Sequence, residues 1–106
     1  MLISGATART LGFIRFTLVP DPVSAEERPT PSFVYQGRFD VQPWSASRLH
    51  NTLLASVYTQ VFDVFVERGG IDLRRQDRTM IDDAECIVES VNDWGDHMEL
   101  QVGARQ

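Results

Sequence analysis

Alternation of apolar and polar residues in the middle of the chain constrains the fold more than any other feature of the sequence. The segment 33–41, FVYQGRFDV, places its apolar side chains on one face of an extended chain: Phe33, Tyr35, Phe39 and Val41. A period of two is the pattern of a β-strand that buries one face. Gly37 lies on that apolar face and indicates a bulge or a close backbone approach. We therefore expect a strand over 33–41 that packs against a core.

Four further segments carry β-strand patterns. Residues 13–19 alternate three apolar side chains with polar ones, namely Ile14, Phe16 and Leu18. Residues 57–67 are rich in β-branched and aromatic residues and predict the longest strand. Residues 84–91 and 97–103 flank the polar sequence DWGDH, so we expect a strand, a turn and a strand that form a hairpin.

The predicted strand over 57–67 is apolar on both faces. Its main buried face comprises Tyr58, Phe62, Val64 and Val66. Val61 and Phe65 lie on the opposite face. We therefore expect a loop or a neighbouring subunit to cover that face as well.

Three other stretches lack a strand pattern. Residues 20–32 hold four of the five prolines, together with charged and small residues, which predicts a mobile loop. Residues 44–58 place apolar residues at helical spacing behind Ser45 or Ser47 as a helix cap, and they predict one short helix or helical turn. A loop with three arginines follows the Gly-Gly turn at 69–70.

These segments together indicate a mainly β protein. About five strands, one short helix and long loops, without a β-α-β alternation, predict a small antiparallel β-barrel or sandwich. A chain of 106 residues has room for one hydrophobic core, so we expect a single domain over 1–106.

The charge of the chain argues against a nucleic-acid-binding face. It has ten arginines, no lysine and fifteen acidic residues, which give a net charge of -5. A protein that binds phosphates without sequence preference needs a basic face. An acidic protein repels DNA instead, which suits a wall along which DNA moves without sticking.

Residues that could carry out chemistry are few and scattered. His50 and His97 lie in no recognisable catalytic motif, and Cys86 has apolar neighbours and no basic flank. One cysteine and two distant histidines give no zinc-ligand spacing, and no glycine-rich phosphate loop is present. We therefore expect no enzymatic activity, no catalytic residues, no metal and no cofactor.

The sequence also predicts a compartment. A single cysteine excludes an internal disulfide. The first residues lack a signal-peptide pattern, and the apolar stretches are far shorter than the roughly 20 residues that span a bilayer. We therefore expect synthesis in the cytoplasm and no membrane association.

The order of the segments resembles that of a known family. The chain reads GFIRFTLVPDP, a proline-rich loop, GRFDVQPWSASRL, YTQVFDVFVE and ECIVESVNDWGDHMELQV. This order is similar to the small head-tail joining proteins of tailed bacteriophages, also called head-closure, stopper or adaptor proteins, and their relatives in gene transfer agents. Val41, Pro43 and Ser45 match the end of one family strand, and VFDVFVER matches an alternating segment. Cys86 stands where the family usually has an aromatic residue, and the family's glutamate after the Pro-Ser element is absent.

The resemblance implies a structural virion protein. It implies a small β-barrel that forms a homo-oligomeric ring, commonly of twelve subunits, at the head-tail interface. Such a ring lies beneath the portal and adaptor proteins, meets the tail or its terminator protein, and surrounds the channel through which DNA passes. The resemblance leaves open which loop docks or gates, and a tail-completion role is a further possibility.

The candidate interface residues are Trp44, Phe65, Arg74, Arg75 and Arg78. The three arginines alternate with Asp72 and Asp77, so that three positive and two negative charges leave only +1. They either form local ion pairs in a solvated turn, or bind an acidic surface of a neighbouring subunit or ring, or contact DNA. The sequence favours contacts with protein over contacts with DNA.

The two tryptophans allow more than one reading. Trp44 is either an interface anchor or a core residue, since buried tryptophan dominates the energetics of many interfaces. Trp94, in a turn beside Gly95, is the second candidate anchor. A rival function is a small β-barrel that binds single-stranded nucleic acid or a peptide through the aromatic sequence FVYQGRF and the arginine loop.

Overall fold

Six antiparallel β-strands in one sheet, one short α-helix and one 3-10 turn make up the structure. The computed structural model describes residues 8–105. The elements in chain order are β1 (Ala8–Pro20), β2 (Glu27–Pro43), α1 (Ala46–His50), η1 (Leu53–Ser56), β3 (Tyr58–Val66), β4 (Arg78–Ile81), β5 (Ala84–Asp93) and β6 (Met98–Arg105). The predicted mainly β, antiparallel fold with one short helix is confirmed.

The sheet closes on itself in the order β1-β2-β3-β6-β5-β4, and we call the closed part the barrel. β1 and β4 meet through one residue pair, Ile14 with Arg78. Beside that pair, the Thr79 hydroxyl donates a hydrogen bond of 2.7 Å to the Gly12 carbonyl. The neighbouring strands pair over at least four residues each, so the contact of β1 with β4 is the seam of the described sheet with the fewest pairs.

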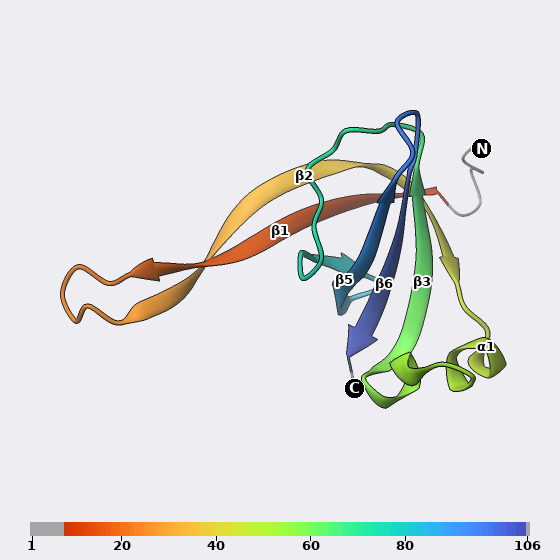
Figure 1. The fold of residues 1–106 in the computed structure, drawn as a ribbon, viewed down its shortest axis with the longest axis horizontal. Helices are drawn as coiled ribbons and strands as arrows, with labels where there is room; N and C mark the ends of the chain where they lie inside the picture. Colours follow the sequence, from red (N-terminus) through yellow and green to blue (C-terminus); the bar gives the residue numbers. More distant parts are fainter. Residues whose placement is uncertain (1–7, 106) are drawn as a thin grey trace.

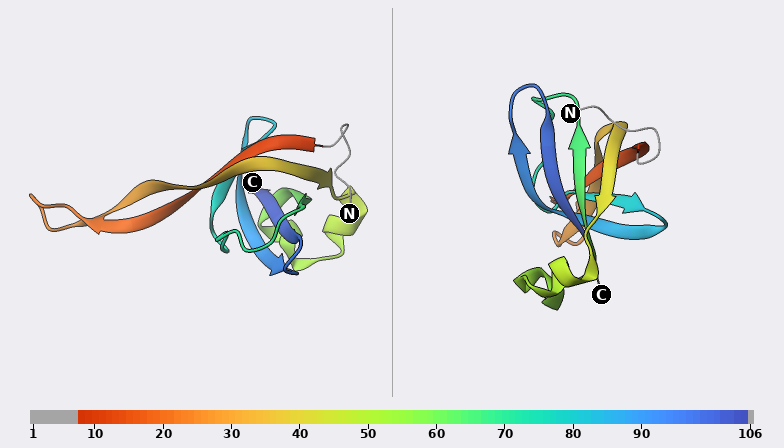
Figure 2. Two further views of the ribbon diagram at one scale, coloured as in Figure 1. Left: turned by 90° about the horizontal axis from the view of Figure 1, so that it is seen from above. Right: turned by 90° about the vertical axis from the view of Figure 1, so that its right-hand side faces the viewer.

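β1 and β2 continue beyond the barrel as a two-stranded ribbon, which we call the arm (residues 14–33; Figures 1 and 2). The two strands stay paired from the barrel out to Pro20 and Glu27. At the tip, the Asp21 N–H donates a hydrogen bond of 2.7 Å to the Glu26 carbonyl. The arm gives the molecule an elongated shape with extents of 49 × 31 × 24 Å.

The loop predicted over 20–32 is wrong for most of its length, because only a short turn separates β1 from β2. Pro29 and Pro31 lie inside β2, opposite Leu18 and Phe16. Proline has no backbone N–H and is tolerated in a strand where the N–H of another residue would point away from the neighbouring strand. Because Pro29 and Pro31 are two residues apart, both lie on the edge of β2 that faces away from β1. The missing donors also disfavour pairing of this edge with another strand.

A β-bulge at Val34 changes the face on which the outer part of β2 presents its side chains. Phe13 pairs with Tyr35 but Ile14 pairs with Phe33, so Val34 has no partner in β1. An extra residue in one strand shifts its side-chain parity, so Phe33 lies opposite Ile14 and is 69% exposed, contrary to its predicted burial. The predicted burial is also wrong for Ile14, Phe16 and Leu18, which are 36, 40 and 63% exposed, because Leu11 and Phe13 point into the barrel core and the even-numbered residues of β1 face away from it.

Gly37 does not mark this bulge. It makes room for the Tyr35 ring, whose nearest atoms would lie 2.7 Å from a Cβ at position 37. The Tyr35 ring in turn packs edge-on against Phe39, with ring centroids 6.0 Å apart.

Apolar residues of all six strands fill the barrel. The largest of the fully buried side chains are Phe13, Phe39, Ile81, Met98 and Leu100. A second cluster forms on the other face of β3, where α1 and η1 cover it: Trp44, Leu49, Tyr58 and Val61. We predicted that a loop or a neighbouring subunit covers this face; over Val61 the cover comes from the chain itself, through α1 and η1.

The helix predicted over 44–58 is confirmed only in its first part. α1 spans Ala46–His50, and the Ser45 hydroxyl caps it by accepting a hydrogen bond of 3.2 Å from the Arg48 N–H. The chain then forms η1 instead of continuing the helix, and Leu53 is 91% exposed. Of the two predicted caps, Ser45 and Ser47, the structure therefore uses Ser45, and the α-helix ends at His50, well before residue 58.

Two hairpins complete the sheet. The sequence assigns residues 78–81 to a loop, but they form β4, which pairs with the start of β5. Asp82 and Asp83, with φ of 51° and 65°, make the two-residue connection, as in type I′ turns. The hairpin predicted over 84–103 forms between β5 and β6.

Candidate interaction surface

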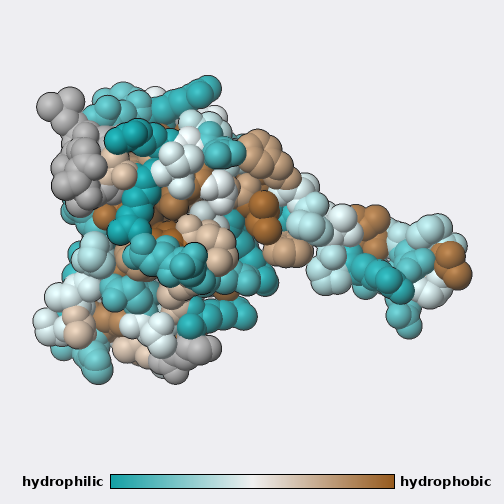
Figure 3. Space-filling view, turned by 180° about the vertical axis from the view of Figure 1, so that it is seen from behind, coloured by the Kyte–Doolittle hydropathy of each residue, from teal (hydrophilic) through white to brown (hydrophobic). Residues whose placement is uncertain are grey.

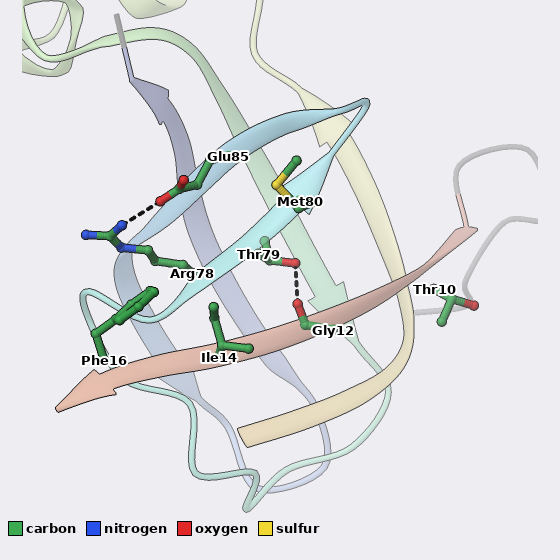
Figure 4. A pocket seen from close by; sticks show the side chains of 8 residues that line it. All are labelled: Thr10, Gly12, Ile14, Phe16, Arg78, Thr79, Met80 and Glu85. Carbon is green, nitrogen blue, oxygen red and sulfur yellow. Dashed lines mark hydrogen bonds and ion pairs between the residues drawn. The ribbon is translucent and has the colours of Figure 1, made fainter. Parts of the chain in front are cut away.

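A groove of about 390 Å³ lies at the base of the arm, where β1 and β4 meet (Figure 4). Its lining residues are Thr10, Gly12, Ile14, Phe16, Arg78, Thr79, Met80 and Glu85. The even-numbered residues of β1 face the groove because Leu11 and Phe13 point into the barrel core. Met80 is 56% exposed, so part of the apolar wall is open to solvent.

The groove continues into an apolar surface on one face of the arm. On β1 this face carries Ile14, Phe16 and Leu18, and their partners on β2 are Phe33, Pro31 and Pro29. Directly opposed residues share a face of a sheet, so these six side chains form one surface, which we call the apolar stripe. Figure 3 shows hydrophobic side chains at the base of the arm and along it, between hydrophilic ones. Contiguous apolar surface on a small acidic domain marks an interaction site.

The opposite face of the arm's base is fixed to the barrel by Arg15. Its Nε and Nη2 donate hydrogen bonds of 2.8 and 2.9 Å to the two carboxylate oxygens of Asp77. Nη2 also donates 2.7 Å to the Asp72 carbonyl. The Asp77 carboxylate accepts the Arg74 N–H at 2.9 Å as well, and Asp77 is only 1% exposed. Hydrogen bonds to Asp77 raise the pKa of Arg15 above its ordinary value, so Arg15 stays charged at every ordinary pH.

The three arginines of the loop are all engaged within the chain. Arg74 binds the Asp72 carboxylate at 2.9 Å, and this contact holds the pKa of Asp72 below its usual value. Arg75 lies 3.4 Å from Glu89. The local ion pairs that the sequence allowed are therefore present, and contacts of these arginines with another subunit stay a prediction.

Arg78 lies farther from the loop than its sequence position suggests, on β4 at the groove. Its Nη1 lies 2.6 Å from the Glu85 carboxylate. Its guanidinium also packs over the Phe16 ring, 4.8 Å from the centroid. Of the five predicted interface residues, Arg78 is the one that lines the groove.

Trp44 and Phe65 are buried in the chain. Trp44 is 8% exposed in the cluster under α1, and the Arg48 guanidinium stacks on it, 3.9 Å from the ring centroid. Its Nε1–H is buried and has no hydrogen-bond partner among the described residues. Phe65 is 9% exposed. Trp44 is therefore a core residue of this chain. Trp94, in contrast, is 61% exposed and stacks beside His97 in the β5–β6 turn.

The residues singled out for chemistry do not come together. His50 is the last residue of α1, and the His97 ring lies 2.6 Å from Asp96 on the surface. Cys86 is free and buried, and burial raises the pKa of its thiol. Within residues 8–105, no three His, Cys, Asp or Glu side chains are grouped so that they could hold a metal ion.

Tyr58 packs closely against β6 on the outer side of the barrel. Its ring covers Gly103, where a Cβ would lie 2.5 Å from ring atoms. Its hydroxyl donates a hydrogen bond of 2.6 Å to Glu89. Burial, helped by the Glu89 charge, raises the pKa of Tyr58 to about 12.

Sequence reasoning missed Leu18, Phe33 and Met80 as surface residues. A signal for the first two was present in the spacing of Pro29 and Pro31, because prolines two residues apart suit the outer edge of a strand. No comparable signal marks Met80, whose strand is four residues long.

No protein-family model, no curated protein and no solved structure matches the chain. Among the helices of residues 8–105, none has the length and apolar character needed to cross a bilayer. The function must therefore be inferred from the surface of this chain and from the family that its segment order resembles.

Proposed function

We propose that the protein is a non-enzymatic assembly subunit that forms a ring at the head-tail interface of a phage-like particle. The observation that carries the proposal is the arm, which extends an exposed apolar face away from the barrel. A projecting apolar surface is costly to expose in a free monomer and becomes favourable when another subunit covers it. The resemblance of the segment order to head-tail joining proteins supplies the kind of assembly.

The electrostatics support a wall of a DNA channel better than a DNA-binding face. The net charge is -5. Arg15, Arg74, Arg75 and Arg78 are each engaged by a carboxylate, so they offer little free charge to phosphates. DNA would pass such a surface without specific contacts, as the proposed ring requires.

The test is binding to isolated portal-adaptor rings of tailed phages, measured by light scattering. We expect the mass of the rings to rise by a whole multiple of 12.0 kDa, with twelve copies on the proposed stoichiometry. The matched control is Leu18→Ser/Phe33→Ser, which removes two exposed side chains of the apolar stripe. Failure to bind such rings at any salt concentration would remove the main support for the neck function.

A second candidate function is the binding of single-stranded nucleic acid. It is favoured by the exposure of Phe33 and Phe16, at 69 and 40%, because exposed aromatic rings can stack on bases. The engaged arginines count against it. Fluorescence anisotropy of a labelled oligonucleotide at low salt separates the two: binding that weakens with salt and with Phe33→Ser supports nucleic-acid recognition, and no binding excludes it.

A further inference from the structure

We propose that the arm of one copy lies in the groove of a second copy of the same chain. The proposal rests on the proposed function in one respect, since a ring needs a contact between copies. The contact itself is inferred from the arm and the groove alone. It joins the outer part of the apolar stripe, Leu18 with its partner Pro29, to the groove between β1 and β4 (Figure 4).

The two surfaces match in polarity. The groove is lined mainly by apolar and small groups, among them Gly12, Ile14 and Met80. The outer stripe presents Leu18, which is 63% exposed, beside Pro29. Burying the stripe and the groove together removes apolar surface from water on each partner, which is the main driving force of association.

The two surfaces also complement each other in charge. The tip of the arm carries Asp21, Glu26 and Glu27 against one arginine, Arg28. Arg28 pairs with Asp21 at 2.9 Å. Because Arg28 is taken up by Asp21, no arginine of the tip is left for Glu26 and Glu27, which form no ion pair within residues 8–105. The tip is therefore acidic.

Arginines surround the groove. Arg38 pairs with Thr10 across the strands and so shares its outward face. Arg78 and Arg105 line a second hollow that adjoins the groove, where Glu85 is paired with Arg78. Neither Arg38 nor Arg105 forms an ion pair with any described residue. An acidic tip placed beside these arginines finds the charge that it lacks in its own chain.

The groove floor is open to an incoming side chain. A Cβ built at Gly12 meets no atom within 4 Å. A leucine at this position would therefore fill the groove without a clash in its own chain, whereas an alanine would leave most of the space. Gly12→Leu and Gly12→Ala form a matched pair that separates blocking of the groove from a change of backbone.

The experiment uses the full chain alone, with its mass measured by sedimentation equilibrium up to about 1 mM. The arm variant is Leu18→Ser, and the groove variant is Gly12→Leu. Their controls are Leu53→Ser, which removes a 91% exposed leucine far from the arm, and Gly12→Ala. Circular dichroism confirms that each variant is folded before its mass is interpreted.

We expect the wild type and both controls to self-associate with increasing concentration, and the arm and groove variants to weaken association at least tenfold. The decisive measurement is on an equimolar mixture of the arm and groove variants. It contains one intact arm and one intact groove per pair, so it forms a one-to-one complex only if the arm binds the groove. A mixture that stays monomeric overturns the proposal, as does a wild type that stays at 12.0 kDa. Association of the groove variant alone at wild-type strength would indicate arm-arm contact, and association of the arm variant alone at wild-type strength would indicate groove-groove contact. Either result also overturns the proposal.

This test can fail independently of the proposed function. Self-association through the arm without binding to portal-adaptor rings leaves the arm-groove contact standing and removes the neck function. Stoichiometric binding to those rings by the Leu18→Ser and Gly12→Leu variants at wild-type affinity supports the neck function and overturns the arm-groove contact.

Discussion

The ion pair between Arg15 and Asp77 offers the sharpest test of how the base of the arm is held. The substitution Arg15→Met keeps the length and much of the apolar stem of the side chain and removes its charge. After this substitution, the Asp77 carboxylate, which is 1% exposed, accepts a hydrogen bond only from the Arg74 N–H among the donors described above. Removing one partner of a buried pair costs about 3 to 5 kcal/mol because the other charge stays buried without compensation.

The lower end of that range applies here. The Arg15 side chain is 21% exposed, so water can partly replace it at the Asp77 carboxylate. We therefore expect Arg15→Met to lower the free energy of unfolding by about 3 kcal/mol. For a chain of this size, with a urea dependence of about 1 to 1.5 kcal/mol per molar, the midpoint of unfolding falls by about 2 to 3 M urea.

The assay is urea unfolding followed by tryptophan fluorescence and circular dichroism; urea is preferred because guanidinium chloride would screen the pair. The matched control is Arg28→Met, which breaks an ion pair on the tip whose arginine is 69% exposed and which should cost less than about 1 kcal/mol. Arg15→Met/Asp77→Asn should cost less than the sum of the single substitutions, because the unpaired charge is gone. A cost of less than 1 kcal/mol for Arg15→Met would refute the reasoning.

Three further predictions concern the barrel. Gly69→Ala should lower the free energy of unfolding by about 2 kcal/mol or more, because its Cβ would clash with the Gly95 carbonyl oxygen. Gly12→Ala should change the free energy of unfolding by less than about 0.5 kcal/mol, because its Cβ would meet no atom within 4 Å. Thermal unfolding of both variants shows whether the contact with Gly95 accounts for the difference. Asp83→Gly should raise stability by about 0.5 to 1 kcal/mol, because Asp83 has a φ of 65° that glycine adopts without strain, and an unchanged urea midpoint would contradict this. The tyrosinate absorbance of the wild type should show a transition near pH 12 that Tyr58→Phe abolishes. The pKa of Tyr58 is higher in the folded than in the unfolded chain. Its contribution to stability is therefore complete below pH 10 and is lost as the pH rises toward 12.

The hairpins of the barrel were the part of the fold most open to prediction. The strands predicted over 33–41 and 84–91 lie within β2 and β5, and the strand predicted over 57–67 contains β3 and exceeds it by one residue at each end. Their residues alternate because one face packs on the barrel core, and that alternation is a local pattern that any reader of the chain can count. The short strand β4 escaped prediction, because four residues that begin with Arg78 hold too little pattern to recognise.

The arm could not be recognised from local pattern. Four prolines over 20–32 indicate a loop in most chains, and only pairing with β1 shows that Pro29 and Pro31 occupy the outer edge of a strand. Likewise, Ile14, Phe16 and Leu18 alternate as a buried strand would. They are exposed because the ribbon runs past the end of the barrel, where no second layer covers it.

The candidate interface residues divide in the same way. The opposite charges around Arg74 and Arg75 are readable in the sequence, and they do form local ion pairs. Trp44 is apolar and large in either reading, and only the packing of α1 against β3 decides that it lies inside.

The sequence by itself determined which residues alternate, where the β5–β6 hairpin turns and that the molecule is acidic, because these depend on neighbours along the chain. The tertiary structure alone decided which apolar face is exposed. One unpaired residue, Val34, shifts the side-chain parity of the outer part of β2 and places Phe33 beside Ile14, and its effect exists only in the register between β1 and β2. The exposed stripe depends on that register and on the even-numbered residues of β1 facing away from the barrel core, so the surface proposed to bind a second copy is a property of the assembled sheet.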